Sequence, residues 1–158
     1  MPETLQPVVT HSSFTIERHY LAPPQRVFAA FADPAKKQRW FVDGDSIQME
    51  SFEMDFRVGG HEVRRFRSLA ESPIKGMTIE NQTVYLDIVP DSRIVIAYTM
   101  AMEGHRFSAS LTTFELIPAT DGTKLVFTEQ AAFFENSDGP ELRKQGWTQL
   151  LDQLAAEV

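Results

Sequence analysis

The 158-residue sequence predicts an α+β fold in which a curved antiparallel sheet packs against one long C-terminal helix. Three long strand-like runs, over about 92–102, 105–117 and 122–134, lead into an amphipathic helix over about 139–158. Large apolar residues recur at helical spacing in that helix and therefore share one face. They are Trp147, Leu150, Leu151, Leu154 and Val158. A sheet covered by one helix can enclose a cavity, so a binding pocket is the first functional question.

The part of the chain before the main sheet is predicted to form one strand and two short helices. Residues 14–20 alternate as a strand does, and Pro23-Pro24 ends it. Pro24 suits the first turn of a helix, because the missing N–H has no partner to lose there. Asp33-Pro34 starts the second helix with an N-cap residue followed by proline.

Six further strands are predicted from runs with strand-like alternation that are separated by short turns. The earlier three cover about 47–57, 61–67 and 78–89, and Gly59-Gly60 fits a tight turn or bulge between the first two. Such connections favour an antiparallel meander, which gives about seven strands in all.

The final helix has its own start signal and one unusual glycine. Ser137 or Asp138 is the expected N-cap, and Pro140 suits the first turn. Gly146 lies beside Trp147, where a missing side chain would allow close approach of another backbone.

The length fits one domain, predicted over 13–158, after a flexible tail over 1–12. That tail lacks the basic region and apolar core of a signal peptide. No apolar run is long enough to span a membrane, so membrane insertion is not expected. The absence of cysteine is compatible with a reducing cytoplasm, which is the predicted location.

Composition also excludes several classes of function. The formal net charge of −7 argues against a general nucleic-acid binder, which needs clustered Lys and Arg for phosphate contacts. The four histidines show no paired metal spacing, and no set of convergent ligands is evident. Ser108 and Ser110 lie in a strand without a nucleophile elbow. We therefore expect neither a metal nor another cofactor.

Several local patterns follow one another in a recognisable order. They are APPQRVF at 22–28, Asp33-Pro34 with Trp40, DFRVGG at 55–60, DGTKL at 121–125, and Gly146-Trp147 with its leucines. Together they resemble the START-like (SRPBCC) superfamily. They look closest to its bacterial group similar to the C-terminal domain of the activator of the 90-kDa heat-shock-protein ATPase.

This resemblance implies a helix-grip fold, with the sheet wrapped round the C-terminal helix and two small helices at one end. Members of the superfamily bind lipids, polyketides, hormones or other apolar molecules in the enclosed cavity. Some are cyclases or hydrolytic enzymes, and the eukaryotic namesake binds a chaperone. The resemblance thus predicts fold more closely than function.

Charged residues on two predicted strands are candidates for a polar cluster in the cavity. Glu62 and Arg64 share one strand face with Phe66. Glu129 would point inward with the apolar residues of its own strand, where an unpaired carboxylate is costly. We predict a Glu62–Arg64–Glu129 cluster that orients a polar ligand head group. A satisfied buried ion pair or an ordinary surface pair is the alternative.

Aromatic side chains are the candidate apolar walls of the pocket. The selected ligand-binding candidates among them are Trp40, Phe66, Tyr85, Tyr98, Phe133 and Trp147. Trp147 is favoured because it lies where the helix meets the sheet. Ordinary core packing is the alternative for each of them.

The leading functional hypothesis is binding of a small, largely hydrophobic ligand, lipid- or polyketide-like, without catalysis. One alternative is a cyclase- or hydrolase-like enzyme in which Glu62 or Glu129 acts as general acid or base. Another is a chaperone-interacting module similar to the ATPase activator. Exposed sheet edges can also pair, which leaves a homodimer open.

Overall fold

The computed structural model describes residues 6–158 and contains one seven-stranded antiparallel sheet in the order β1-β7-β6-β5-β4-β3-β2. The strands are β1 (Thr10–Tyr20), β2 (Ile47–Met54), β3 (His61–Ser68), β4 (Thr78–Val89), β5 (Arg93–Met102), β6 (His105–Ala119) and β7 (Gly122–Phe133). The helices are α1 (Pro24–Ala32), α2 (Pro34–Lys37), the π-helical turn η1 (Gln38–Val42), α3 (Gly139–Leu154) and the 3-10 turn η2 (Ala155–Glu157). The predicted fold class is confirmed.

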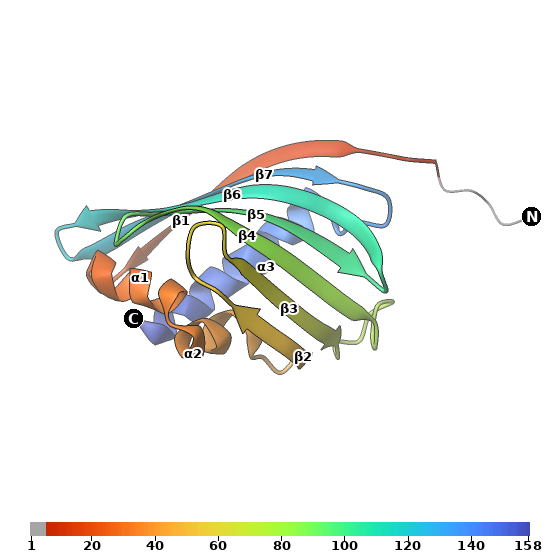
Figure 1. Ribbon diagram of the computed structural model, residues 1–158, viewed down its shortest axis with the longest axis horizontal. Helices are drawn as coiled ribbons and strands as arrows, with labels where there is room; N and C mark the ends of the chain where they lie inside the picture. The colour runs from red at the N-terminus through yellow and green to blue at the C-terminus, as the bar shows by residue number, and fades with distance from the viewer. Residues whose placement is uncertain (1–5) are drawn as a thin grey trace, which may run out of the picture.

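The sheet curves round α3, while α1 and α2 lie at the end of the sheet near the C-terminus (Figure 1). Strands β2 to β7 follow one another as a meander, and β1 pairs with β7 at the opposite edge from β2. The two short helices and η1 carry the chain from one edge of the sheet to the other. This arrangement places α3 against the inner face of the sheet.

The inner face follows the period-two alternation of the strands. In β7, Leu125, Phe127, Glu129 and Ala131 are all buried, as their spacing predicts. The apolar half of the core lies under the C-terminal half of α3, where Leu151 and Leu154 are fully buried.

Trp147 is the centre of the aromatic packing in this core. Its ring centroid lies 4.8 Å from that of Phe127, 5.7 Å from Phe114 and 5.9 Å from Phe41. The contacts with Phe127 and Phe114 are inclined and the contact with Phe41 is stacked, and aromatic pairs favour inclined or offset-stacked arrangements. They fix the position of α3 relative to β6 and β7.

The predicted N-terminal tail is too long. Residues 10–12 belong to β1 and pair with residues 131–133 of β7. Strand β7 extends to Phe133, and its backbone groups provide hydrogen-bond partners for those additional residues. The part of the predicted tail over residues 1–5 lies outside the described residues.

The Gly59-Gly60 turn is confirmed. Gly59 has φ +83°, a conformation that glycine adopts without steric cost. A Cβ at Gly60 would lie 2.1 Å from the carbonyl oxygen of Asp55, so only glycine fits there. Gly59 donates its N–H to Tyr85 O at 2.7 Å, and Gly60 O accepts from Tyr85 N at 3.0 Å. The turn is thereby attached to β4.

The explanation predicted for Gly146 is wrong. A Cβ at this position would meet no atom within 4 Å, so no backbone approaches closely. Gly146 instead borders a cleft between α3 and the sheet. Within residues 6–158, none of the helices has the length and apolar character needed to cross a membrane.

Candidate functional site

A band of buried polar side chains crosses the inner face of the sheet beneath the N-terminal half of α3. The strand register aligns Arg64 with Asn81, and Asn81 with Met100. Polar residues continue the band across the neighbouring strands. We call this set the inner polar band: Glu62, Arg64, Asn81, Thr83, Tyr98, Ser108, Ser110, Thr112 and Glu129.

Arg143 of α3 binds the centre of the inner polar band. Its Nη1 donates to the Tyr98 hydroxyl at 3.1 Å, and its Nη2 donates to Ser108 Oγ at 2.8 Å. Asp138 accepts two further bonds from the same guanidinium, each of 2.9 Å. Burial by itself lowers the pKa of Arg143, but nearby Tyr98, Asp138 and Glu129 outweigh burial and raise it. Arg143 therefore stays charged.

Asp138 is the N-cap residue of α3, but its side chain makes no capping hydrogen bond. Both carboxylate oxygens are directed to Arg143 instead. Ser137 Oγ accepts a bond from Gly139 N at 3.2 Å. Of the two predicted cap residues, Ser137 thus bonds the backbone at the helix start, whereas Asp138 binds Arg143. A bidentate bond to a guanidinium is stronger than a bond to a neutral amide.

Ser108 faces Arg143 because it follows the inward alternation of β6 together with Ser110 and Thr112. The pairing of β5 with β6 contains a bulge directly before it, and Phe107 is the extra residue of that bulge. Phe107 is buried as well, although strict alternation would turn it to the opposite face. Strand alternation therefore places the Ser108 hydroxyl, and the bulge explains the burial of its neighbour.

Glu129 is fully buried and lies beside Arg143. Its Oε1 accepts hydrogen bonds from the hydroxyl groups of Tyr98 and Thr112, at 2.5 and 3.0 Å. Its Oε2 has no hydrogen-bond partner within residues 6–158 and lies 3.8 Å from Arg143 Nη1. Burial raises the pKa of Glu129, although the two hydroxyl bonds and Arg143 act in the opposite direction.

Glu62 is bound by a different set of residues. It accepts a 2.6 Å hydrogen bond from Tyr85 and forms a 3.2 Å ion pair with Lys37. The Lys37 ammonium also lies 4.6 Å from the centroid of the Phe41 ring. This buried group ties α2 and η1 to β3 and β4.

Arg64 is buried and packs against two aromatic rings. Its Cζ lies 4.2 Å from the centroid of Phe41 and 4.7 Å from that of Phe66. Nη1 donates to the Phe41 carbonyl oxygen at 2.7 Å, whereas Nε has no hydrogen-bond partner in the described part of the chain. Burial lowers the pKa of Arg64 to about 10, so it remains cationic at neutral pH.

A cleft of about 140 Å³ lies between α3 and strands β3 to β5. Its walls are Phe41, Arg64, Asn81, Tyr98, Met100, Asp138, Leu142, Arg143, Gly146, Trp147 and Leu150. Leu142 is 59% exposed and forms part of the rim. The cleft therefore joins apolar walls to the polar band and reaches solvent beside α3.

The structure brings three of the nine predicted site residues to this cleft, namely Arg64, Tyr98 and Trp147. Phe66 and Phe133 lie one layer away, stacked on Arg64 and Arg143 respectively. Trp40 belongs to the core near α1 and donates its indole N–H to Ala30 O at 2.8 Å.

The predicted pairing of Arg64 with Glu62 and Glu129 is wrong, although all three side chains share the inner face. Within residues 6–158, Arg64 forms no ion pair with either carboxylate. Lys37 and Arg143 reach the two carboxylates from helical segments, and strand spacing alone contains no information about those segments.

Arg143 is the main residue that the sequence interpretation missed. A signal was available, because Arg143 precedes Trp147 by four residues and so lies on the same helix face. The apolar residues that predict this face begin only at Trp147, so their periodicity does not include an arginine. Met100 of β5 also lines the cleft.

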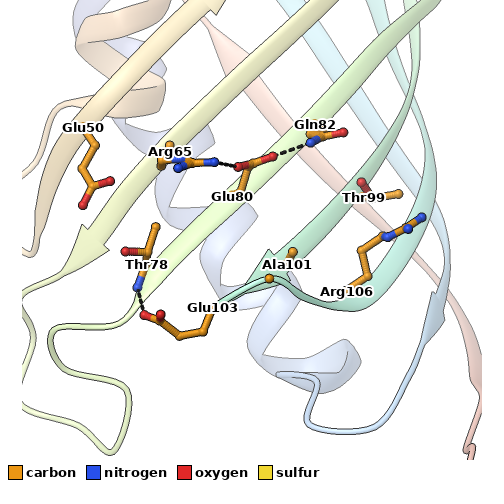
Figure 2. A pocket seen from close by; sticks show the side chains of 10 residues that line it. Glu50, Arg65, Thr78, Glu80, Gln82, Thr99, Ala101, Glu103 and Arg106 are labelled. Atoms are coloured by element: carbon orange, nitrogen blue, oxygen red, sulfur yellow. Dashed lines mark hydrogen bonds and ion pairs between the residues drawn. The ribbon is translucent and has the colours of Figure 1, made fainter.

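A larger hollow, of about 600 Å³, lies on the outer face of strands β3 to β6. Figure 2 shows Arg65, Glu80 and Gln82 bonded in a row across it, with α3 behind the sheet. Glu103 accepts from Thr78 N at 2.7 Å. These polar groups satisfy one another, so the inner cleft is the stronger candidate site. No group of His, Asp or Glu suited to a metal occurs within residues 6–158.

A family model described as Activator of Hsp90 ATPase homolog 1-like protein matches residues 21–158. A solved protein from Rhizobium loti is 50% identical, with a TM-score of 0.84 and coverage of 96% of this chain and 99% of that chain. An uncharacterised protein from Rhizobium leguminosarum is 36% identical, with a TM-score of 0.86 and coverage of 96% and 97%. An AHSA1-like protein from Aeromonas hydrophila, 20% identical with a TM-score of 0.68 and coverage of 93% and 92%, shares the fold. No curated protein is significantly similar to the chain.

Proposed function

Since this chain belongs to the Activator of Hsp90 ATPase homolog 1-like family, we propose that it binds a small, largely hydrophobic molecule in the cleft beside α3, without catalysis of its own. The family fold supports the proposal by placing a helix over a curved sheet. The cleft then supplies the space and the chemistry for a ligand.

The observation that carries the proposal is Gly146 at the rim of the cleft. Glycine inside a helix costs about 0.5–1 kcal/mol relative to alanine. No neighbouring protein atom requires glycine here, because a Cβ would meet nothing within 4 Å. A ligand that lies against the backbone of α3 would require it.

The size of the cleft favours a compact ligand over a long lipid tail. A cavity of about 150 Å³ holds a molecule the size of benzene, whereas drug-sized ligands occupy about 300–1,000 Å³. The cleft of about 140 Å³ thus accommodates one ring or a short branched chain. Leu142 and Leu150 at its border would contact any part that extends outward.

The catalytic alternative has weaker support. Neither Glu62 nor Glu129 lines the cleft, so neither carboxylate contacts a molecule held there. A general acid or base must reach the proton that it transfers directly or through one water. The Oε2 of Glu129, which has no hydrogen-bond partner among residues 6–158, lies 3.8 Å from Nη1 of Arg143, and it is Arg143 rather than Glu129 that lines the cleft.

Native mass spectrometry of the protein purified without detergent tests the proposal. We expect a co-purifying small molecule, and we expect Gly146→Leu to abolish its retention because the new side chain fills the cleft. Gln145→Leu is the matched control, since Gln145 lies outside the cleft on the exposed side of α3. Equal retention by both variants would contradict binding at this site.

A second candidate is an activator-like protein-interaction module, which the family match over residues 21–158 favours. The measurement is the ATPase rate of a 90-kDa heat-shock protein with and without this chain. A rise in that rate that persists in Gly146→Leu would favour interaction independent of the cleft. An unchanged rate would remove this candidate.

A further inference from the structure

We infer that the ligand of the cleft is a compact monocarboxylate, with its carboxylate bound by Arg64 and its apolar part against Met100, Trp147 and Leu150. This inference rests on the proposed function and specifies its ligand class.

Arg64 is the buried cation of the cleft that has no anion bound to it. It is 8% exposed, and within residues 6–158 its hydrogen bond goes to a neutral carbonyl oxygen. A buried charge without a counter-charge is costly, and a bound anion relieves that cost. Aromatic faces at 4.2 and 4.7 Å offset part of it but leave the in-plane N–H groups available.

The nearby carboxylates are already bound by other residues. Glu62 pairs with Lys37 and Tyr85, and Asp138 binds Arg143 with both oxygens. Glu129 accepts from Tyr98 and lies beside Arg143. Each of these carboxylates is hydrogen-bonded or ion-paired elsewhere, and Glu62 acts on Arg64 only through its charge, which raises the pKa of Arg64 against the effect of burial. An anion from outside the chain would be the one that bonds directly to the free edge of this guanidinium.

The orientation of Arg64 selects a planar, two-oxygen anion. Nη1 is committed to the Phe41 carbonyl, while the structure shows no acceptor for Nε or Nη2 within the described part of the chain. Nε and Nη2 form one edge of the guanidinium, and that edge binds a carboxylate with two parallel hydrogen bonds. The rings of Phe41 and Phe66 pack against the guanidinium and restrict its orientation.

Asn81 supplies a second donor next to Arg64. The two residues are cross-strand partners in β3 and β4, and both line the cleft. Asn81 Oδ1 accepts from Thr83 Oγ1 at 3.4 Å, which leaves the Nδ2 amide as a donor. Among residues 6–158, none accepts a hydrogen bond from that amide. A carboxylate at Arg64 would therefore gain a further bond from the neighbouring strand.

The test compares benzoate with benzamide, which has the same ring and size but no charge. Titration of the full-length ¹⁵N-labelled protein by NMR follows the amides of Asn81, Gly146 and Trp147. We expect both probes to shift these amides, with benzoate binding at least about tenfold more tightly. Sodium phosphate at equal ionic strength should leave them unshifted, since it lacks the ring.

Arg64→Met should reduce benzoate affinity to that of benzamide and leave benzamide unchanged. Arg65→Met is the matched control, because it removes the same charge from the same strand. Arg65 lies on the outer face, where it pairs with Glu80. Arg64→Lys keeps the charge but loses the two-bond edge, so it should lose most of the preference. It also provides the answer if Arg64→Met does not fold.

The outcomes distinguish a failure of the carboxylate inference from a failure of the proposed function. Equal binding of both probes, or a preference that survives Arg64→Met or Arg64→Lys, would overturn the carboxylate inference and leave the cleft as a binding site. A shift with phosphate alone would overturn it too. If neither ring probe shifts the cleft amides, the proposed function fails with it.

Discussion

The buried charged residue Glu129 is bound by partners that are distant in the sequence. Glu129 points inward as its strand predicts, but its partners Tyr98, Thr112 and Arg143 come from β5, β6 and α3. Its alternation with Phe127 indicates burial, whereas the identity of the partner depends on where α3 crosses the sheet. The candidate residue was thus predictable from the sequence, and its pairing was not.

Glu129 should make stability depend on pH. Its native pKa is raised above the ordinary value of 4.5, so the native state holds this proton more tightly than the unfolded chain. The free energy of unfolding should therefore fall as pH rises from about 4.5 to the native pKa. Glu129→Gln should remove that fall, so the variant gains stability relative to wild type across this window.

Urea unfolding at several pH values between about 4 and 8 measures this difference. Glu115→Gln, on the exposed face of β6, controls for the loss of one negative charge. A constant difference between Glu129→Gln and wild type at all pH values would contradict the assignment.

At the scale of elements, helix α3 combines two environments along one face. Leu151 and Leu154 pack on the apolar core, Trp147 lies between, and Arg143 enters the inner polar band. The helix itself was predicted from its period. Its polar end was missed because a search for apolar periodicity passes over an arginine, even one at the correct spacing of four residues.

The two glycines with defined surroundings should respond oppositely to alanine. Gly146→Ala should raise the free energy of unfolding by about 0.5–1 kcal/mol, because the Cβ meets no atom within 4 Å and helix propensity improves. Gly60→Ala should lower it, since the Cβ would lie 2.1 Å from Asp55 O. Thermal and urea unfolding of both variants measure the pair. Destabilisation by Gly146→Ala would show that α3 needs glycine for its own packing.

For the whole molecule, the interior between the curved sheet and α3 consists of an apolar half and a polar half that contains a cleft. Leu125, Phe127, Leu151 and Leu154 are fully buried in the first half. The second half contains the inner polar band and the cleft of about 140 Å³. Fewer apolar contacts there should lower the local stability of the N-terminal half of α3.

Amide hydrogen exchange should reveal this difference. We expect slower exchange over residues 150–154 than over 143–147, because the former segment covers the apolar half. Benzoate should slow exchange over 143–147 more than over 150–154. Uniform protection along α3 would contradict the division of the interior.

The sequence by itself determined the elements of this protein, since strand and helix periods, prolines and the Gly59-Gly60 turn are local properties of the chain. The order of the local sequence patterns along the chain also predicted the family, and the match over residues 21–158 confirms that prediction. Only the tertiary structure decided that Arg143 and Lys37 bind the two buried carboxylates and that Arg64 has none. The reason is physical: a buried charge is satisfied by whichever group the packing brings within a few ångströms, and that distance depends on how α3 and η1 lie against the sheet.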